Sequence, residues 1–286
     1  MSLYISTSCL KPKLGLLETL NLFEKLNIKN VEIGVWREDG KDYKKFFKNH
    51  NFNFIIHHYF PPPKKPFIIN LASQNKKILG KSINQIKKST DFCSNLNINL
   101  FSFHAGFRVD PDINLKFNFN NIPDYEKSFN IFKNSVQEIV KYAEEKNVRV
   151  AIENNVVSEY NLINGENKLL LMAELWEFKR LFREIPSENL GILLDFGHLK
   201  VNSHLLNFDR NKFIEGLKDK VFAVHIHENN GRIDQHRKLR KDSWCFKVIN
   251  KYFKNKETPL VMEGKYSNIE ELINNKNLIE KSLKNE

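Results

Sequence analysis

Eight short apolar runs recur along the chain, and longer segments with a helical spacing of apolar residues separate them. The runs are only a few residues long, apolar on both faces and rich in Val, Ile and Phe, which is typical of parallel strands buried between helices. We therefore predict eight strands, at Leu3–Thr7, Val31–Gly34, Phe54–His58, Leu100–His104, Val148–Glu153, Gly191–Asp195, Val221–His227 and Leu260–Glu263.

A helix is predicted after each strand. In residues 127–143, for example, apolar positions recur close to i, i+3, i+4 and i+7, which places them on one helix face. The predicted helices cover residues 16–27, 41–50, 81–97, 126–147, 171–182, 209–219, 243–254 and 268–283. Strands that each precede a helix, joined by right-handed crossovers, form a (β/α)₈ TIM barrel. We predict a single α/β domain of this kind over residues 1–286, because no linker interrupts the pattern.

Composition changes this picture little. The chain has 45 Lys and Arg against 34 Asp and Glu, a formal net charge of +11. Basic proteins bind nucleic acids through phosphate contacts, but these lysines are scattered over the predicted helices. Three distant cysteines argue against a disulfide framework. Since no apolar run is long enough for a transmembrane helix and the N-terminus does not resemble a signal peptide, we expect a cytoplasmic protein without a membrane partner.

Metal-binding side chains gather at the predicted carboxyl ends of the strands, which in a TIM barrel converge on one mouth. Taken singly, such a histidine is more often a hydrogen-bonded residue of the core or rim than a ligand. Their repetition from the third strand to the eighth, with carboxylates that would repel one another without a cation, predicts metal binding. The residues are His57 or His58, His104, Glu153, Asp195, His198, His227, Asp234, His236 and Glu263. Because neighbours on a pleated strand face opposite sides, only one of the two can face the mouth, and the distance to Phe60 and the apolar segment beyond favours His57.

The same strand ends resemble those of the xylose isomerase-like barrel superfamily, which includes endonuclease IV. The shared motifs are HAG at 104–106, ENN at 153–155, LLDFGH at 193–198, HENNGRIDQH at 227–236 and the late Glu263, in this order over nearly the whole chain. The resemblance implies one divalent metal bound by Glu153, Asp195, His227 and Glu263, with His225 one layer deeper. For three-metal members it implies further ligands at His57, His104, His198, Asp234 and His236, with Glu153 bridging two ions.

Two enzymatic hypotheses follow from the resemblance. In a sugar or polyol isomerase/epimerase, the metal would polarise the substrate and Glu153 and Glu263 would transfer the proton through an enediolate. In an endonuclease IV-like phosphodiesterase, the metals would activate water for cleavage of DNA at abasic sites. The large ligand set and basic charge favour the nuclease. We favour the isomerase/epimerase, because residues 5–34 resemble that branch and lack the glycine-rich first loop of the nuclease branch. A non-catalytic barrel would not need so many donors at an open mouth.

Four further residues are candidates for binding substrate: Trp36, Arg37, His58 and Lys265. Trp36 would offer a face for stacking on a sugar, and Arg37 and Lys265 would contact an anionic group. A basic loop after His236 carries weaker candidates, Arg237, Arg240 and Lys241, which a solvated surface explains as well. We expect a small carbohydrate as substrate rather than nucleic acid, one to three divalent ions of zinc or manganese as cofactor, and a homodimer as the default assembly.

Overall fold

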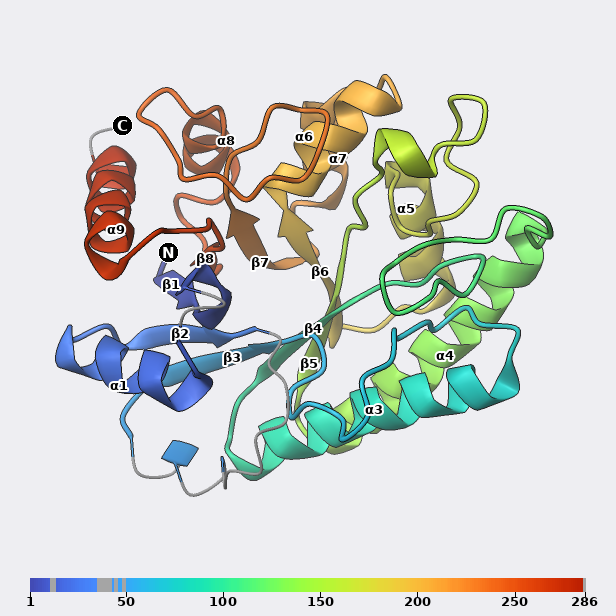
Figure 1. The fold of residues 1–286 in the computed structure, drawn as a ribbon, viewed down its shortest axis with the longest axis horizontal. Coiled ribbons are helices and arrows are strands. Elements are labelled where there is room, and N and C mark those ends of the chain that lie inside the picture. The colour runs from blue at the N-terminus through green and yellow to red at the C-terminus, as the bar shows by residue number, and fades with distance from the viewer. Residues whose placement is uncertain (11–13, 35–42, 44–45, 48–49, 285–286) are drawn as a thin grey trace.

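Eight parallel strands close into one barrel in the computed structural model, which describes residues 1–10, 14–34, 43, 46–47 and 50–284 (Figure 1). The strands pair in chain order, and β8 returns to β1 with Leu3 opposite Leu260. Their bounds are β1 Leu3–Ser6, β2 Asn30–Ile33, β3 Asn53–His57, β4 Leu100–His104, β5 Arg149–Glu153, β6 Leu190–Asp195, β7 Val221–Ile226 and β8 Leu260–Met262. The predicted (β/α)₈ TIM barrel is therefore confirmed.

Helices surround the barrel, and Figure 1 shows α3 and α4 lying side by side outside β4 and β5. The helices are α1 Leu16–Lys25, α3 Lys76–Asn95, α4 Tyr125–Glu145, α5 Leu175–Glu184, α6 Phe196–Leu205, α7 Arg210–Leu217, α8 Cys245–Tyr252 and α9 Ile269–Lys284, with 3₁₀ turns η1 Thr7–Leu10 and η2 Glu159–Asn161. The helix predicted at 41–50 falls largely outside the described residues. None of the helices in the described part of the chain is long and apolar enough to cross a membrane.

Helix α6 was not predicted, and it carries part of the functional site. It begins at the end of β6, where the Asp195 side chain accepts a hydrogen bond from the backbone N–H of His198 at 2.7 Å and caps the helix. Phe196, Leu199 and Val201 are all buried, so α6 is covered on more than one side. A helix buried in this way has no single apolar stripe, which explains why the hydrophobic pattern missed it.

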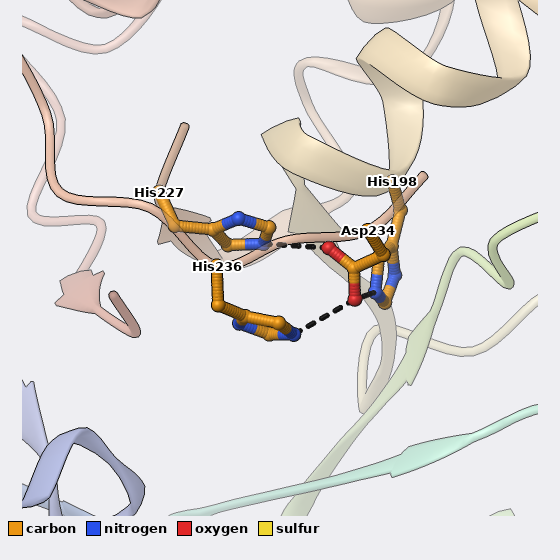
Figure 2. Close-up of side chains that lie close together, drawn as sticks. All are labelled: His198, His227, Asp234 and His236. Atoms are coloured by element: carbon orange, nitrogen blue, oxygen red, sulfur yellow. Dashed lines mark ion pairs between the residues drawn. The ribbon is translucent and has the colours of Figure 1, made fainter. Parts of the chain in front are cut away.

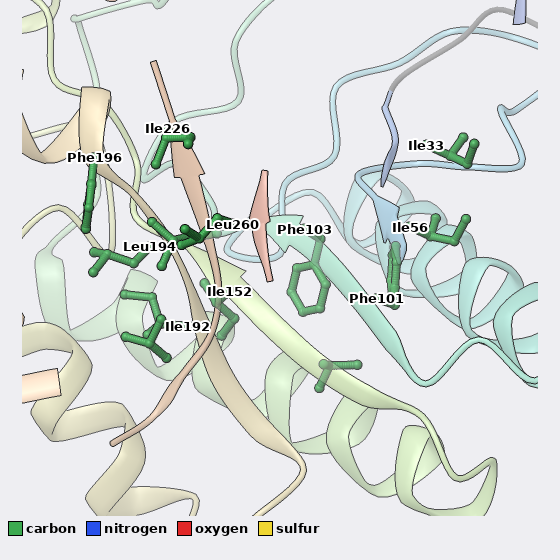
Figure 3. Packing of buried hydrophobic residues seen from close by; sticks show 14 of the residues in the cluster. Ile33, Ile56, Phe101, Phe103, Ile152, Ile192, Leu194, Phe196, Ile226 and Leu260 are labelled. Atoms are coloured by element: carbon green, nitrogen blue, oxygen red, sulfur yellow. The ribbon is translucent and has the colours of Figure 1, made fainter. Parts of the chain in front are cut away.

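Alternate side chains of each strand enter two different cores. One set faces the surrounding helices and includes Phe101, Phe103, Ile152 and Leu194 (Figure 3). The other set fills the barrel interior with Ile55, Leu100, Ala151, Leu193, Ala223 and Val261. Since side chains alternate with a period of two, the next inward positions are His57, Glu153, Asp195 and His225 on four strands and Glu263 directly after β8. An apolar layer thus supports a polar layer at the carboxyl ends of the strands.

Two long connections cover one side of this polar layer. The β4–α4 connection, residues 105–124, pairs with the β5–α5 connection, residues 154–174, through hydrogen bonds such as Leu171 N–H to Gly106 O at 3.2 Å. An apolar cluster packs them together, with Val157, Leu169 and Leu170 buried against Phe107 and Phe117. These connections form a wall of the mouth.

Candidate metal centre

Four groups of His, Asp and Glu lie close together among the described residues; one joins Glu32, His57 and His225, and the other three contain the predicted ligands. Within each group, one potential ligand atom per residue lies within 4.8 Å of the others. The first group contains His57, His104 and Glu153, the second contains Glu153, Asp195, His225 and Glu263, and the third contains His198, His227, Asp234 and His236. The fold therefore brings together every ligand residue predicted from the sequence, adds His225, and leaves Glu153 shared between two groups.

The first group is organised around one oxygen of Glu153. Oε2 of Glu153 lies 2.8 Å from Nδ1 of His104 and 3.5 Å from Nε2 of His57. His104 and Glu153 are register partners on β4 and β5, while His57 comes from β3 and places its Nδ1 3.0 Å from the hydroxyl of Ser102. Burial lowers the pKa of His57 and so favours the neutral imidazole, the form that binds metals.

The second group surrounds His225. Its Nδ1 lies 3.0 Å from Oε2 of Glu263, 3.4 Å from Oε1 of Glu153 and 3.5 Å from Oδ2 of Asp195, yet it makes no well-formed hydrogen bond within the described structure. A buried nitrogen that faces three carboxylate oxygens without bonding to one is consistent with a ligand of a central cation.

The resemblance implied that His227 lies with Glu153, Asp195 and Glu263, whereas the structure brings His225 together with these three residues. Asp195 and His225 are register partners on β6 and β7, so both point into the same layer. Strand β7 ends at Ile226, and His227 lies beyond it, against the start of α6 in the third group. The two histidines share a face in the sequence pattern, but only the register shows which one lies level with Asp195.

Glu32 lies behind the second group, and the sequence reasoning assigned it no role in the site. It is fully buried on β2, and its Oε2 lies 2.7 Å from Nε2 of His225. A carboxylate on the second nitrogen of a histidine fixes the ring orientation and makes the first nitrogen a better metal ligand. Its position could have indicated a role from the sequence alone, because Glu32 is an acidic residue between the apolar residues of a predicted strand.

The third group joins α6 to the connection that follows β7 (Figure 2). Nε2 of His236 lies 2.8 Å from Oδ2 of Asp234, Nε2 of His198 lies 3.5 Å from the same oxygen, and Nε2 of His227 lies 3.8 Å from Oδ1. His227 also lies 3.1 Å from Oδ2 of Asp195, which connects the third group to the second.

The charges in the centre call for a cation. Burial opposes ionisation of Glu153 and Asp195, but the adjacent histidines outweigh it and hold both pKa values well below normal. The pKa of Glu263 falls to about 2 for the same reason, with His225 as its main partner. Burial disfavours the charged form of His236, yet Asp234 and Glu263 raise its pKa to about 9. Protons on the histidines thus balance the carboxylates, and divalent ions would replace these protons, so the residues fit a metal centre.

A cavity of about 300 Å³ opens above the ligand groups. Its floor includes Glu153, Glu263 and His104, and its wall includes His58, one of the predicted substrate contacts. Lys265 is exposed and lines a neighbouring surface depression with Arg237 and Arg240, so the structure does not place it at the central cavity. Lys241 borders another outer depression. Trp36 and Arg37 lie outside the described residues.

Among known proteins, the chain is similar to an uncharacterized protein and to a probable endonuclease. The chain is 26% identical over 207 residues to the uncharacterized protein MJ1614 of Methanocaldococcus jannaschii, and the aligned region covers 71% of this chain and 69% of that protein. It is 28% identical over 188 residues to the probable endonuclease 4 of Aquifex aeolicus, covering 62% of this chain and 59% of the relative.

Solved structures match the fold over its full length. A D-tagatose 3-epimerase-like protein superposes with a TM-score of 0.78 at 20% identity, covering 99% of this chain and 97% of the other. The 3-keto-D-glucoside 4-epimerase YcjR of E. coli gives a TM-score of 0.69 at 12% identity, covering 99% and 98%. The family model described as xylose isomerase-like TIM barrel matches residues 21–284. The chain belongs to the xylose isomerase-like TIM barrel family.

Proposed function

We propose that the chain is a divalent-metal-dependent isomerase or epimerase of a small, uncharged carbohydrate-derived substrate. The observation that carries this proposal is the cavity above the second group. Its volume of about 300 Å³ is at the lower end for ligand pockets and suits one small molecule. Among the described residues, no Lys or Arg lines it, so neither of these side chains is there to bind a phosphate. A neutral substrate fits this lining better than a sugar phosphate or a DNA strand.

The cavity has a polar floor and an apolar wall. The floor holds the ligand groups, while the wall above is formed by Phe107, Leu115, Phe117 and Leu170. A fully hydroxylated ligand would leave hydroxyl groups without partners against such a wall, which is costly. The wall therefore favours a substrate with vicinal oxygens at one end and an apolar face or substituent at the other.

Glu263 is the better placed of the two predicted catalytic glutamates to exchange a proton with substrate. Its side chain is 13% exposed toward the cavity, and its low pKa keeps it ionised and able to accept a proton. The side chain of Glu153 is 1% exposed, and its oxygens face His104 on one side and His225 on the other. We assign proton abstraction to Glu263 and, on the opposite side, proton return to the Glu153–His104 pair.

A bound divalent ion of zinc or manganese would polarise the substrate carbonyl and favour loss of the adjacent proton. The protein's own part is to hold two substrate oxygens over the second group with the reacting carbon toward Glu263. The paired connections 105–124 and 154–174 exclude water from one side of the cavity.

The second candidate is cleavage of DNA at abasic sites. Two observations favour it: the centre offers three ligand groups, two of which share Glu153, and one relative is named a probable endonuclease 4. Multinuclear sites suit phosphodiester hydrolysis, because two or more ions stabilise both the attacking and the leaving oxygen. Against it stands the absence of Lys and Arg from the described lining of the cavity.

One experiment separates the two. Protein purified without chelator is incubated in D₂O with neutral ketoses and aryl- or alkyl-substituted keto sugars, and deuterium uptake beside the carbonyl is followed by NMR. Deuterium uptake that Glu263→Gln abolishes, and that exposed Glu270→Gln retains, supports the isomerase/epimerase. The same preparations are given a duplex with one abasic site; cleavage without deuterium uptake on any substrate would establish the nuclease instead.

A further inference from the structure

We infer that His227 closes the third group into a structural metal site with four protein ligands, which takes a zinc-like divalent ion and fastens the β7–α8 connection to the barrel. This goes beyond the proposed function, because the ion would not contact the substrate. The inference rests on ring orientation, ligand number and the local packing of His227.

All three imidazoles of the group place Nε2 within 4 Å of Asp234, although Nε2 of His227 lies nearer to Oδ2 of Asp195, at 3.1 Å. The Nε2 atoms of His198 and His236 lie 3.5 and 2.8 Å from its Oδ2, and Nε2 of His227 lies 3.8 Å from its Oδ1 (Figure 2). Oδ1 is buried and has no hydrogen-bond partner within the described structure. A buried carboxylate oxygen left in this state needs a cation or a donor, and the surrounding nitrogens point to a cation.

In two of the three histidines, the backbone selects the tautomer that a metal requires. Nδ1 of His198 lies 2.8 Å from the carbonyl oxygen of Asn154, and Nδ1 of His236 lies 3.0 Å from the carbonyl oxygen of Glu263. A carbonyl oxygen only accepts, so in each neutral ring Nδ1 carries the proton and Nε2 keeps its lone pair. This support of the second ring nitrogen is typical of histidines that bind metals.

The number of ligands separates the third group from the first. The first group offers three side chains, which leaves a position open for substrate or water. The third group offers three histidines and one aspartate, which fill a tetrahedral zinc site. Without His227 the third group would also be an open site with three ligands, so His227 alone decides whether the site is open or fully coordinated by the protein.

The start of α6 is shaped to accept His227. A Cβ on Gly197 would overlap Cε1 of His227, so only glycine leaves room for the ring. On its other side the ring stacks on His236, with centroids 4.1 Å apart and planes inclined by 19°. Nδ2 of Asn229 donates to the carbonyl of Gly197 at 2.8 Å and holds the chain beyond β7 against the helix. His227 is thus kept where it faces Asp234.

An ion here would add a further link between two segments that Lys200 already joins through Glu228 and the carbonyl of Asn229. Asp234 and His236 lie in the connection between β7 and α8, whereas His198 lies on α6. His236 has a φ of 48°, a left-handed conformation that a non-glycine residue adopts only with support from its surroundings. Both residues border the substrate cavity, so the ion would keep one of its walls in place.

The test compares His227→Ala with His204→Ala, a control on the exposed side of α6. Each protein is loaded with zinc and dialysed against a moderate chelator, and the retained zinc and the thermal midpoint are measured. We expect wild type and the control to retain about one zinc more per chain than His227→Ala, whose third zinc should bind at least about 100-fold more weakly. The zinc-dependent rise in midpoint should shrink only in His227→Ala. Equal retention in all three proteins would overturn the inference.

A second measurement distinguishes a ligand from a residue that only orients Asp195, 3.1 Å away. Zinc-edge anomalous maps of His227→Ala crystals should lose density beside His198 and keep it beside Glu263. The opposite pattern would overturn the inference. If His227→Ala does not fold, His227→Gln, which keeps a polar side chain, is measured in its place. Neither measurement uses turnover, so both remain decisive if the proposed isomerase activity is not found.

Discussion

Glu32→Gln should weaken divalent-ion binding although Glu32 would not contact the ion. Its carboxylate and the imidazole of His225 are both fully buried and lie 2.7 Å apart, so the substitution removes a charge-assisted hydrogen bond from the back of the ring. His225 then loses the partner that keeps its Nδ1 turned toward Glu153, Asp195 and Glu263 and makes that nitrogen more basic.

Substituting such outer partners costs about 10–100-fold in metal affinity, or about 1.4–2.7 kcal/mol. Glutamine keeps a carbonyl oxygen that can accept from Nε2–H, so Glu32→Gln should fall near the lower value and Glu32→Ala near the upper. Oε1 of Glu32 has no hydrogen-bond partner within the described structure, so one orientation of glutamine would bury an unpaired amide. This should also lower the free energy of unfolding by about 1–3 kcal/mol.

The assay is zinc competition against a fluorescent chelator, alongside urea unfolding of the metal-free proteins. The chain offers a matched control in Glu24, whose Oε1 lies 2.9 Å from Nδ1 of His50 at the surface. Glu24→Gln removes the same kind of pair and should leave zinc affinity unchanged. Equal zinc affinities for Glu32→Gln, Glu24→Gln and wild type would refute the positioning role, even if Glu32→Gln were less stable.

Three further predictions concern stability. Gly197→Ala should lower the free energy of unfolding in urea by about 1–3 kcal/mol, because the new methyl group overlaps His227. Gly80→Ala on α3, where a Cβ would meet no atom within 4 Å, should raise it by about 0.5–1 kcal/mol, and equal effects of the two changes would contradict the crowding at α6. Asn202→Ala should cost about 3 kcal/mol, because Asn202 accepts from Val157 N–H and donates to Asn155 O, each at 2.7 Å, and a loss under 1 kcal/mol would count against these bonds. Removing divalent ions with chelator should lower the thermal midpoint, and adding zinc or manganese should restore it, since ligands that bind only the folded state stabilise it; an unchanged midpoint would argue against the metal centre.

The barrel could be predicted from the sequence because strand patterns are local. Runs such as LFSFH and VRVAIE show buried strands without knowledge of the rest of the chain, and each ends on the inward donor that the structure places at the mouth, His104 and Glu153. Helix α6 could not be predicted in this way, because its buried surface extends around more than one face.

Which donors form a group was not readable from the chain. The choice between His225 and His227 depends on the register of β7 against β6, including an irregularity between Ile192 and Leu193, and on the end of β7 at Ile226. The role of Glu32 depends on a contact across 193 residues of sequence.

The sequence by itself determined the closed barrel, the strand ends that carry the chemistry and the kind of side chain placed there. These follow from periods of two and 3.6 residues, which are properties of the local backbone. Only the tertiary structure decided that His225 joins the second group, that His227 joins the third, and that no Lys or Arg among the described residues lines the cavity above them. The reason is physical: a metal group or a cavity is defined by distances of a few ångströms between side chains from different strands, and those distances exist only once the barrel has closed.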